Sequence, residues 1–300
     1  MSGPIICVGH AALDRIYRIG AFPPKPSKVR ATEHVESGGG MAANAAATIA
    51  TLGSKVELWS RVGGDDAGRR IRAGLKQAKV DIRYVETFDD GRSSTSAIIV
   101  DADGERLVVG VRDPHIPAGT SWLPMERVTS AALVLADLRW LEAVRSVFAQ
   151  ARSADVPTVL DADVGARGSL TELLSLTDYA IFSEAALAEY LPNLEQQARL
   201  ERVMLLGPRH AGVTLGRAGY TWLDPFGGGS CPAFDVEVVD TTGAGDAFHG
   251  AFALALSENR PIVECARFAS AVAAIKCMRL GSRAGLPNRP QVEKFLAEHD

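Results

Sequence analysis

Short apolar runs recur along the chain and alternate with stretches of helical pattern. The first run, residues 5–8 (IICV), ends at Gly9 and is typical of a buried parallel strand. Because helical patterns lie between several of these runs, the alternation predicts a parallel sheet with helices on both faces. The other runs that we interpret as strands are residues 56–59, 132–136, 158–160, 179–182, 203–206 and 213–215.

Helices are expected where alanine-rich or amphipathic stretches occur. Residues 41–52 are rich in alanine and are followed by Gly53, a residue type that commonly ends helices. The patterns predict further helices at residues 66–78, 141–151, 244–256 and 262–278. The last third of the chain is therefore expected to be mostly helical.

Two stretches interrupt this rhythm. Residues 15–36 contain a cluster of prolines, and residues 93–112 contain two apolar runs on either side of Asp103-Gly104. An Asp-Gly pair between apolar runs is a strong signal for a β-hairpin. We therefore expect a single α/β domain over residues 1–300, with a small β-lid from about 15–36 and 93–112 over the carboxyl edge of the sheet.

The segment that carries the most chemistry is residues 238–248, VVDTTGAGDAF. A β-branched run leads into small residues, after which a helix is expected to begin. The glycines at 243 and 245 allow the backbone to approach a ligand closely. The N–H groups of Gly243, Ala244, Gly245 and Asp246 would be free donors at a helix N-terminus, an arrangement that binds phosphate.

Asp246 lies in the same first turn. A carboxylate there could take the proton from a substrate hydroxyl as it attacks phosphorus, and such general-base help is worth about a hundred- to ten-thousand-fold. The alternative is that Asp246 caps the helix and the glycines form a tight turn, and this short pattern alone does not decide between the two. No Gly-Lys-Ser/Thr follows, as a Walker A loop requires, and residues 9–12 (GHAA) lack the dinucleotide-binding pattern of a dehydrogenase.

Four motifs, in this order, resemble those of the ribokinase-like (PfkB) family of carbohydrate kinases, and the resemblance extends over about residues 4–297. It implies a ribokinase-like α/β fold, ATP-dependent phosphorylation of a sugar hydroxyl, and Mg²⁺ as the companion of ATP. The motifs are residues 38–44 (GGGMAAN), 62–68 (VGGDDAG), 213–219 (VTLGRAG) and 240–246 (DTTGAGD).

The resemblance also implies roles by position. Two of the implied residues, Asp14 and Asp246, follow predicted strands, where parallel sheets bind ligands. The implied residues are Asp246 as the catalytic base; Gly243, Ala244 and Gly245 as its anion hole; Asp14, Gly39, Gly40 and Asn44 toward the sugar; and Ser183, Thr214, Gly216, Gly219 and Thr241 toward the nucleotide.

One motif departs from the family. Its members usually carry Asn-x-x-Glu after a central strand, near the magnesium and the phosphates, whereas this chain reads SEAA at residues 183–186. The groups that organise the metal are therefore left open. Asp161 and Asp163 are candidates, and both could equally be ordinary turn residues at the end of a strand.

Four cationic residues lie in or near the proposed lid and pocket: Lys28, Arg30, Arg112 and Arg139. Arg139 follows a predicted strand and should point into the crevice, whereas Lys28 is expected on a lid strand. An anionic tail on the substrate explains this cluster, with Lys28, Arg112 and Arg139 as its ligands. A solvated lid surface explains it as well.

Within the family, the chain most resembles the sulfofructose kinases, on Lys28, residues 135–140, residues 182–184 and residues 276–285, although Gly110 stands where that branch has an asparagine. The expected acceptor is the primary hydroxyl of a ketose, with 6-deoxy-6-sulfofructose first. Fructose, ribose, a keto-deoxy sugar acid or a nucleoside are the alternatives. A non-catalytic sugar- or nucleotide-binding regulator on the same fold is the alternative outside enzymes.

The composition of the chain limits the classes of partner that we expect. The chain is 47% hydrophobic and 23% charged with a net charge of −4, so nothing global favours nucleic acid or an anionic membrane. No apolar run reaches the roughly 18 residues that a membrane helix needs, the first residues do not resemble a signal peptide, and the four cysteines form no C-x-x-C pair. We expect a cytoplasmic protein with a possible homodimer through the β-lid, since exposed strand edges invite partners.

Overall fold

The computed structural model describes residues 3–102, 104–165 and 167–299. Nine strands in this part form the main sheet, in the order β13-β12-β11-β10-β9-β8-β1-β4-β5. From β11 to β5 all neighbours are parallel, whereas β12 and β13 form an antiparallel edge. The bounds are β1 Ile5–Val8, β4 Val56–Gly63, β5 Val85–Phe88, β8 Leu133–Asp137, β9 Thr158–Ala162, β10 Tyr179–Ser183, β11 His210–Thr214, β12 Tyr220–Asp224 and β13 Gly227–Cys231.

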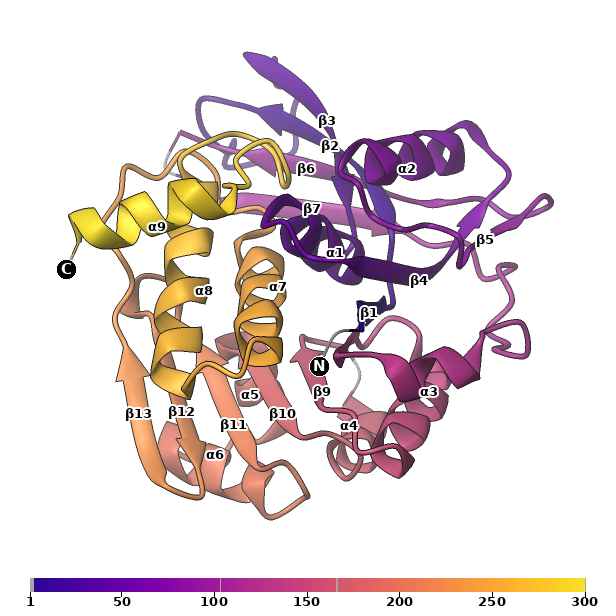
Figure 1. Ribbon diagram of the computed structural model, residues 1–300. Helices are drawn as coiled ribbons and strands as arrows, with labels where there is room; N and C mark the ends of the chain where they lie inside the picture. The colour runs from indigo at the N-terminus through magenta and orange to yellow at the C-terminus, as the bar shows by residue number, and fades with distance from the viewer. Residues whose placement is uncertain (1–2, 103, 166, 300) are drawn as a thin grey trace.

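Helices cover both faces of this sheet, and each face has its own hydrophobic core (Figure 1). One core is built with α1 (Met41–Thr51), α2 (Asp66–Gln77), α7 (Ala244–Ser257), α8 (Ile262–Cys277) and α9 (Arg289–Glu298). The other is built with α3 (Leu141–Ser153), α4 (Arg167–Leu174), α5 (Glu184–Tyr190) and α6 (Gln196–Met204). The predicted fold class is therefore confirmed.

A second, smaller sheet stands apart from the main one, at the top of Figure 1, and is called the lid sheet below. Its order is β3-β2-β6-β7, with β6 and β7 joined as the expected hairpin. Asp103 of the predicted turn lies outside the described residues. The bounds are β2 Ala12–Arg18, β3 Glu33–Gly39, β6 Ser94–Val100 and β7 Arg106–Val111.

Two sequence-based expectations were wrong in detail. Residues 203–206 do not form a strand, because Val203 belongs to the buried face of α6 with Leu200. A run of four apolar residues is too short for periodicity to separate strand from helix. In the lid, the strands occupy only the two ends of the expected region, and residues 19–32, which contain the prolines, form an irregular connection. No helix among the described residues is long and apolar enough to cross a bilayer.

Candidate active site

The N-terminus of α7 faces the carboxyl edge of the main sheet, and the glycines before it shape its first turn. Gly243 is the N-cap residue with φ +77°, a left-handed conformation that favours glycine. A Cβ there would also crowd Ser282, at 3.1 Å. The N–H of Ala244 donates to the carbonyl of Thr241 at 3.1 Å, so it is used within the turn. Of the three residues predicted to form the anion hole, Ala244 therefore has an N–H that is already paired within the turn.

Asp246 lies in this first turn and is held by α1. Asn44 Nδ2 donates to Asp246 Oδ2 at 2.7 Å. Loss of hydration raises the pKa of Asp246 to about 7, and the negative charge of Asp161 adds to this rise while the Asn44 hydrogen bond opposes it. A carboxylate with a pKa near neutrality is suited to accept a proton and release it again.

A chain of polar side chains continues from Asn44 to the lid sheet. Arg283 donates to Asn44 Oδ1 at 2.8 Å and to the Gly39 carbonyl at 3.2 Å. Burial lowers the pKa of Arg283 to about 10, and the nearby carboxylates of Asp14 and Asp246 oppose this shift. Asp14, on β2, is itself buried and 3.5 Å from the Ser282 hydroxyl. Arg283 thus lies among three of the groups predicted to face the sugar, namely Asn44, Gly39 and Asp14.

The glycines of residues 38–40 make room for these groups. A Cβ on Gly38 would overlap the guanidinium of Arg283, and one on Gly39 would overlap the carboxylate of Asp14. Gly40 has φ +88° and caps α1. Arg283 lies in the stretch 276–285, for which the sequence indicated no individual roles. Nothing in the order of residues along the chain shows that Arg283 contacts Asn44.

Asp137 lies in the stretch 135–140 that carries the resemblance, but no role was predicted for it. It lies at the end of β8 with 0% exposure, and its carboxylate accepts the N–H groups of His10 at 2.7 Å, Ala42 at 3.0 Å and Arg139 at 2.8 Å. It therefore ties three segments of the site together. The available signal was an aspartate at the end of an apolar run, where parallel strands meet ligands.

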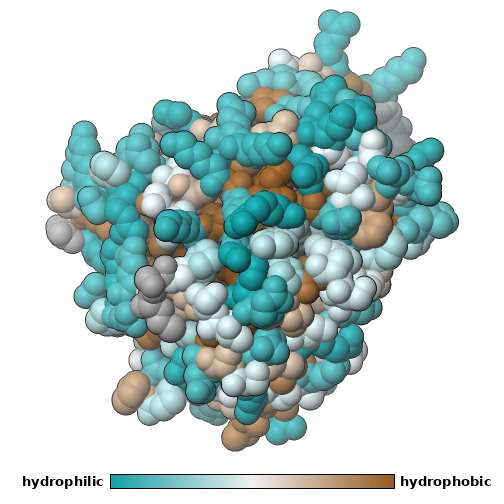
Figure 2. Space-filling model, turned by 45° about the vertical axis from the view of Figure 1, so that its right-hand side comes forward, coloured by the Kyte–Doolittle hydropathy of each residue, from teal (hydrophilic) through white to brown (hydrophobic). Residues whose placement is uncertain are grey.

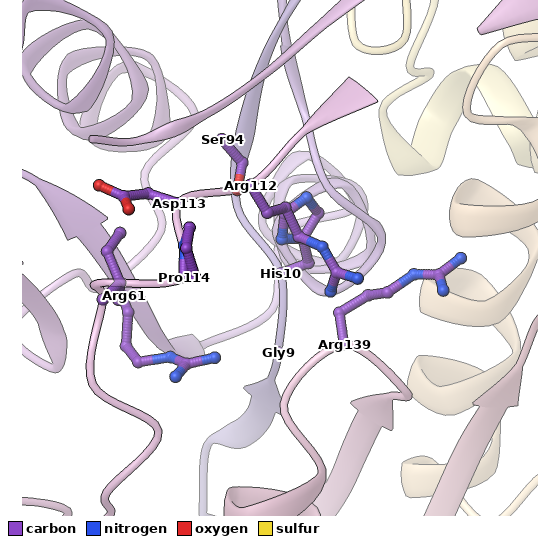
Figure 3. A pocket seen from close by; sticks show the side chains of 9 residues that line it. Gly9, His10, Arg61, Ser94, Arg112, Asp113, Pro114 and Arg139 are labelled. Atoms are coloured by element: carbon purple, nitrogen blue, oxygen red, sulfur yellow. The ribbon is translucent and has the colours of Figure 1, made fainter. Parts of the chain in front are cut away.

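Three arginines surround a cavity of about 450 Å³ beside these residues (Figure 3). Arg61 comes from β4, Arg112 follows β7, and Arg139 follows β8. His10 lies with them, and burial lowers its pKa to about 4, so it is neutral near pH 7. We refer to this cavity as the arginine pocket. Its charge comes from the three guanidinium groups, which remain protonated, and from the carboxylate of Asp113, which also lines the cavity.

Two of the arginines are held in place by neighbouring groups. Arg61 lies 4.2 Å from the centre of the Trp140 ring and donates to the Pro117 carbonyl at 2.7 Å. Arg139 donates to the Val164 carbonyl at 2.8 Å and lies 3.4 Å from Asp163. Arg61 was not among the predicted site residues, although it comes two positions after the apolar run 56–59.

Lys28 was placed wrongly. It is exposed in the irregular connection of residues 19–32, not on a lid strand, and it does not line the arginine pocket. The prolines before it break the strand pairing, since proline has no N–H to contribute to a ladder. Arg112 and Arg139, by contrast, both line the pocket as expected.

A buried aspartate and histidine lie beneath the first turn of α7. His249 Nδ1 is 2.7 Å from the Gly245 carbonyl, and His249 Nε2 is 3.5 Å from Asp161 Oδ1. Burial raises the pKa of Asp161 well above its usual range, with the charges of Asp163 and Asp137 adding to the rise. Asp163 accepts from the Ser183 hydroxyl at 3.0 Å. Among the described residues, no group of three or more His, Cys, Asp or Glu is arranged to hold a metal.

The residues predicted to face the nucleotide lie along neighbouring strand ends. Ser183 ends β10 and caps α5, and Thr214 ends β11 and donates to the Phe182 carbonyl at 3.3 Å. Gly216 and Gly219 have φ of +55° and +92° in the turn that leads to β12. Thr241 accepts from Arg106 of the lid sheet at 2.6 Å.

The fold and this site are typical of one class of enzyme, an α/β phosphotransferase that uses a helix N-terminus and a nearby carboxylate. Residues 4–289 match the family described as pfkB family carbohydrate kinase. The chain belongs to this family and is an ATP-dependent carbohydrate kinase.

Individual relatives agree over nearly the whole chain. The ribokinase of Bacillus subtilis is 30% identical over 97% of this chain and 99% of its own length. The ATP-dependent ribose-1-phosphate kinase of Halopiger xanaduensis is 28% identical, with 98% of both chains covered. The structure of Arabidopsis thaliana ribokinase complexed with ribose and ATP superposes with a TM-score of 0.86 at 26% identity, covering 99% of each chain.

Proposed function

We propose that this enzyme transfers the γ-phosphoryl group of ATP to a sugar hydroxyl, with Asp246 as the base. The observation that carries the proposal is the carboxylate of Asp246 at the N-terminus of α7, held by Asn44 at 2.7 Å and with a pKa raised to about 7. Asp246 accepts the hydroxyl proton, and the oxygen then forms its bond to phosphorus as the bond to ADP breaks. The N–H groups of Gly243 and Gly245 stabilise the charge on the transferring group.

We propose that the nucleotide binds at the ends of strands β10 and β11, next to the start of α7. The residues proposed to contact the nucleotide are Ser183, Thr214 and Thr241, together with the turn at Gly216 and Gly219. The Arabidopsis relative that was crystallised with ribose and ATP shares the fold over 99% of this chain, which supports a nucleotide in this position.

Magnesium would accompany ATP. Mg²⁺ keeps several waters and usually takes one or two carboxylates besides the phosphates, so a dedicated three-ligand cluster is not required. Asp163 fits this requirement, because it directly follows β9 and its side chain is 33% exposed. Bound there, the ion would neutralise phosphate charge.

The proposed substrate carries an anionic group. Arg61, Arg112 and Arg139 approach one cavity from three segments, and fixed guanidinium groups suit sulfonates, phosphates and carboxylates. We place 6-deoxy-6-sulfofructose first, phosphorylated at its primary hydroxyl. A sugar phosphate is the second candidate, because the same pocket suits phosphate and the Halopiger relative is a ribose-1-phosphate kinase.

The test is an ADP-release assay over a sugar panel with wild-type enzyme and Arg139→Ala. The panel holds 6-deoxy-6-sulfofructose, ribose 1-phosphate, a keto-deoxy sugar acid, fructose, ribose and adenosine. A charge-assisted contact contributes roughly 1.5–3 kcal/mol, so Arg139→Ala should lower kcat/KM for the anionic ketose by at least about tenfold. Fructose turnover should hardly change, because it lacks the charge.

Arg145→Ala is the matched control, since Arg145 lies on α3 and pairs with Glu172 at 2.9 Å. It should leave all substrates unaffected. Equal losses for anionic and neutral ketoses in Arg139→Ala would make Arg139 a structural residue, tied to Asp163 and Val164, and would remove the support for an anionic substrate.

We also propose a homodimer through the lid sheet. Strand β7 is the edge of that sheet, and Leu107, Val108, Val109 and Val111 on it are 50% to 62% exposed. An apolar edge strand with free backbone groups favours pairing with another strand. A second copy of the chain presents the same strand, so the contact is self-complementary.

A further inference from the structure

Lys276, in the last turn of α8, is a buried lysine that the proposed reaction does not use. Its side chain has 0% exposure, and Nζ donates to the backbone carbonyl of Asp240 at 2.7 Å. An ammonium group is strongly hydrated, and its burial is costly unless it is paired and hydrogen-bonded. Methionine or leucine would fill the same volume without this cost, so the charge calls for an explanation.

The partner of Lys276 stands at the start of the catalytic turn. The side chain of Asp240 accepts from the N–H of Thr242 and from the N–H of Gly281, each at 2.8 Å. The Cys277 carbonyl accepts the N–H groups of both Val239 and Asp240, at 2.8 and 3.1 Å. The end of α8 and the start of the turn are therefore one hydrogen-bonded unit.

This unit lies directly behind the donors of the anion hole. Thr242 leads into Gly243, whose backbone packs against Ser282 of the segment that Asp240 anchors. Burial lowers the pKa of Lys276, while the charges of Asp240 and also of Asp246 oppose the shift.

We propose that Lys276 is a positioning residue, a built-in cation that holds the turn of residues 240–243 so that the N–H groups of Gly243 and Gly245 point at the transferring phosphoryl group. The inference rests on the proposed anion hole. Because the ammonium group belongs to a side chain of the protein, it holds the turn of residues 240–243 in place before ATP binds. Positioning of this kind affects rate strongly, since a displacement of about 1 Å can cost about a hundredfold.

The test is chemical rescue of Lys276→Ala, which removes the ammonium and leaves space for a small cation. We expect kcat to fall by about a hundredfold, with part of it restored by ethylammonium or K⁺ at constant ionic strength. Tetramethylammonium is too large for the space and should not restore activity. Wild-type turnover should be the same in all three salts.

Lys276→Met keeps the volume and removes the charge, so it covers the case in which the alanine variant fails to fold. It should keep its far-ultraviolet circular dichroism, lose a similar factor in kcat, and respond to none of the salts. Lys294→Met is the matched control, because Lys294 is 77% exposed on α9. Wild-type kcat in Lys276→Met, or a loss in Lys276→Ala that no cation restores, would overturn the proposal.

A measurement of the affinity for ATP distinguishes a failure of the Lys276 proposal from a failure of the proposed function. Calorimetric titration of ATP into Lys276→Met should show a Kd raised about tenfold, since misaligned donors bind phosphate less well and 1.4 kcal/mol corresponds to a factor of ten. A wild-type protein that binds ATP but phosphorylates no sugar would contradict the proposed function alone. An unchanged Kd together with an unchanged kcat would contradict the role of Lys276 alone.

Discussion

At the residue scale, two aspartates of the site, Asp14 and Asp246, have different surroundings and therefore suit different roles. Asp14 and Asp246 are both in poorly hydrated positions, and burial raises the pKa of each. Asp14 is compensated by hydrogen bonds from Ser96 and Ser282 and by the charge of Arg283. Asp246 instead has a second carboxylate, Asp161, close by. The first is therefore suited to hold hydroxyls, and the second to exchange a proton.

The raised pKa of Asp246 predicts how activity depends on pH. Below its pKa of about 7 the carboxyl is protonated and cannot act as a base, so kcat/KM should fall about tenfold for each further pH unit. Asp246→Asn should lower kcat by about a hundredfold or more. A pH series of the wild type, with a substrate that does not titrate in this range, checks the first expectation. Near wild-type turnover in the variant would remove Asp246 from the mechanism.

The same shift predicts an effect on stability. The native pKa of about 7 lies above the unfolded value of about 3.9, so the folded state binds the proton more tightly between these pH values. Stability from this group is therefore lost as the pH rises through 7. Asp246→Asn should melt at a higher temperature than wild type at pH 8, and the difference should vanish near pH 4. A difference that grows on acidification would contradict the assigned shift.

At the element scale, Asp65 connects the lid sheet to the body. It is the N-cap of α2 and accepts the Gly68 N–H at 2.9 Å. It also accepts the Ser93 hydroxyl at 2.7 Å and the Ser93 N–H at 3.1 Å, immediately before β6 begins. One carboxylate thus orders a helix start and the entry to a lid strand.

Asp65→Ala should lower the free energy of unfolding by about 1–2 kcal/mol, because an N-cap and its partners are lost. Urea denaturation followed by circular dichroism measures this. Asp66→Ala is the matched control, since Asp66 is exposed and only pairs with Arg69 and Arg70. That change should stay within about 0.5 kcal/mol. Similar values for the two variants would show that Asp65 is an ordinary surface residue.

At the scale of the whole molecule, one face shows hydrophilic residues around the outside with hydrophobic residues near the centre (Figure 2). The strands of the lid sheet extend from the body, and β7 has all six of its residues exposed. Its only paired neighbour in the sheet is β6. This leaves an apolar strand edge for the proposed second copy.

Val109→Lys should convert the dimer to a monomer, because two facing lysines would repel and a charge would replace the apolar contact. Size-exclusion chromatography with light scattering measures the mass directly. Val263→Lys is the control, since Val263 is 62% exposed on α8, away from the lid sheet. A wild-type mass equal to one chain at micromolar concentration would contradict the dimer.

The sequence by itself determined the fold class, the hairpin of the smaller sheet and the glycine-rich start of α7. Apolar runs between helices are a local signal, and the turn at residues 240–246 combines glycines with an aspartate at a helix start, so adjacent residues carry the information. The same holds for the Gly53 stop after α1, where φ is +93°. Residues 203–206 are an exception, because such a short apolar run is compatible with a strand and with part of a helix.

Only the tertiary structure decided which distant side chains share the site. Arg283 reaches Asn44 across 239 positions of the chain, and Asp137 meets Ala42 across 95. Arg61 joins Arg139 because β4 and β8 flank β1 in the sheet order. Lys28 falls outside this group, because the prolines before it end the strand pairing and leave it in an irregular connection. These contacts are set by which strands lie next to each other, and a single sequence does not encode that order locally.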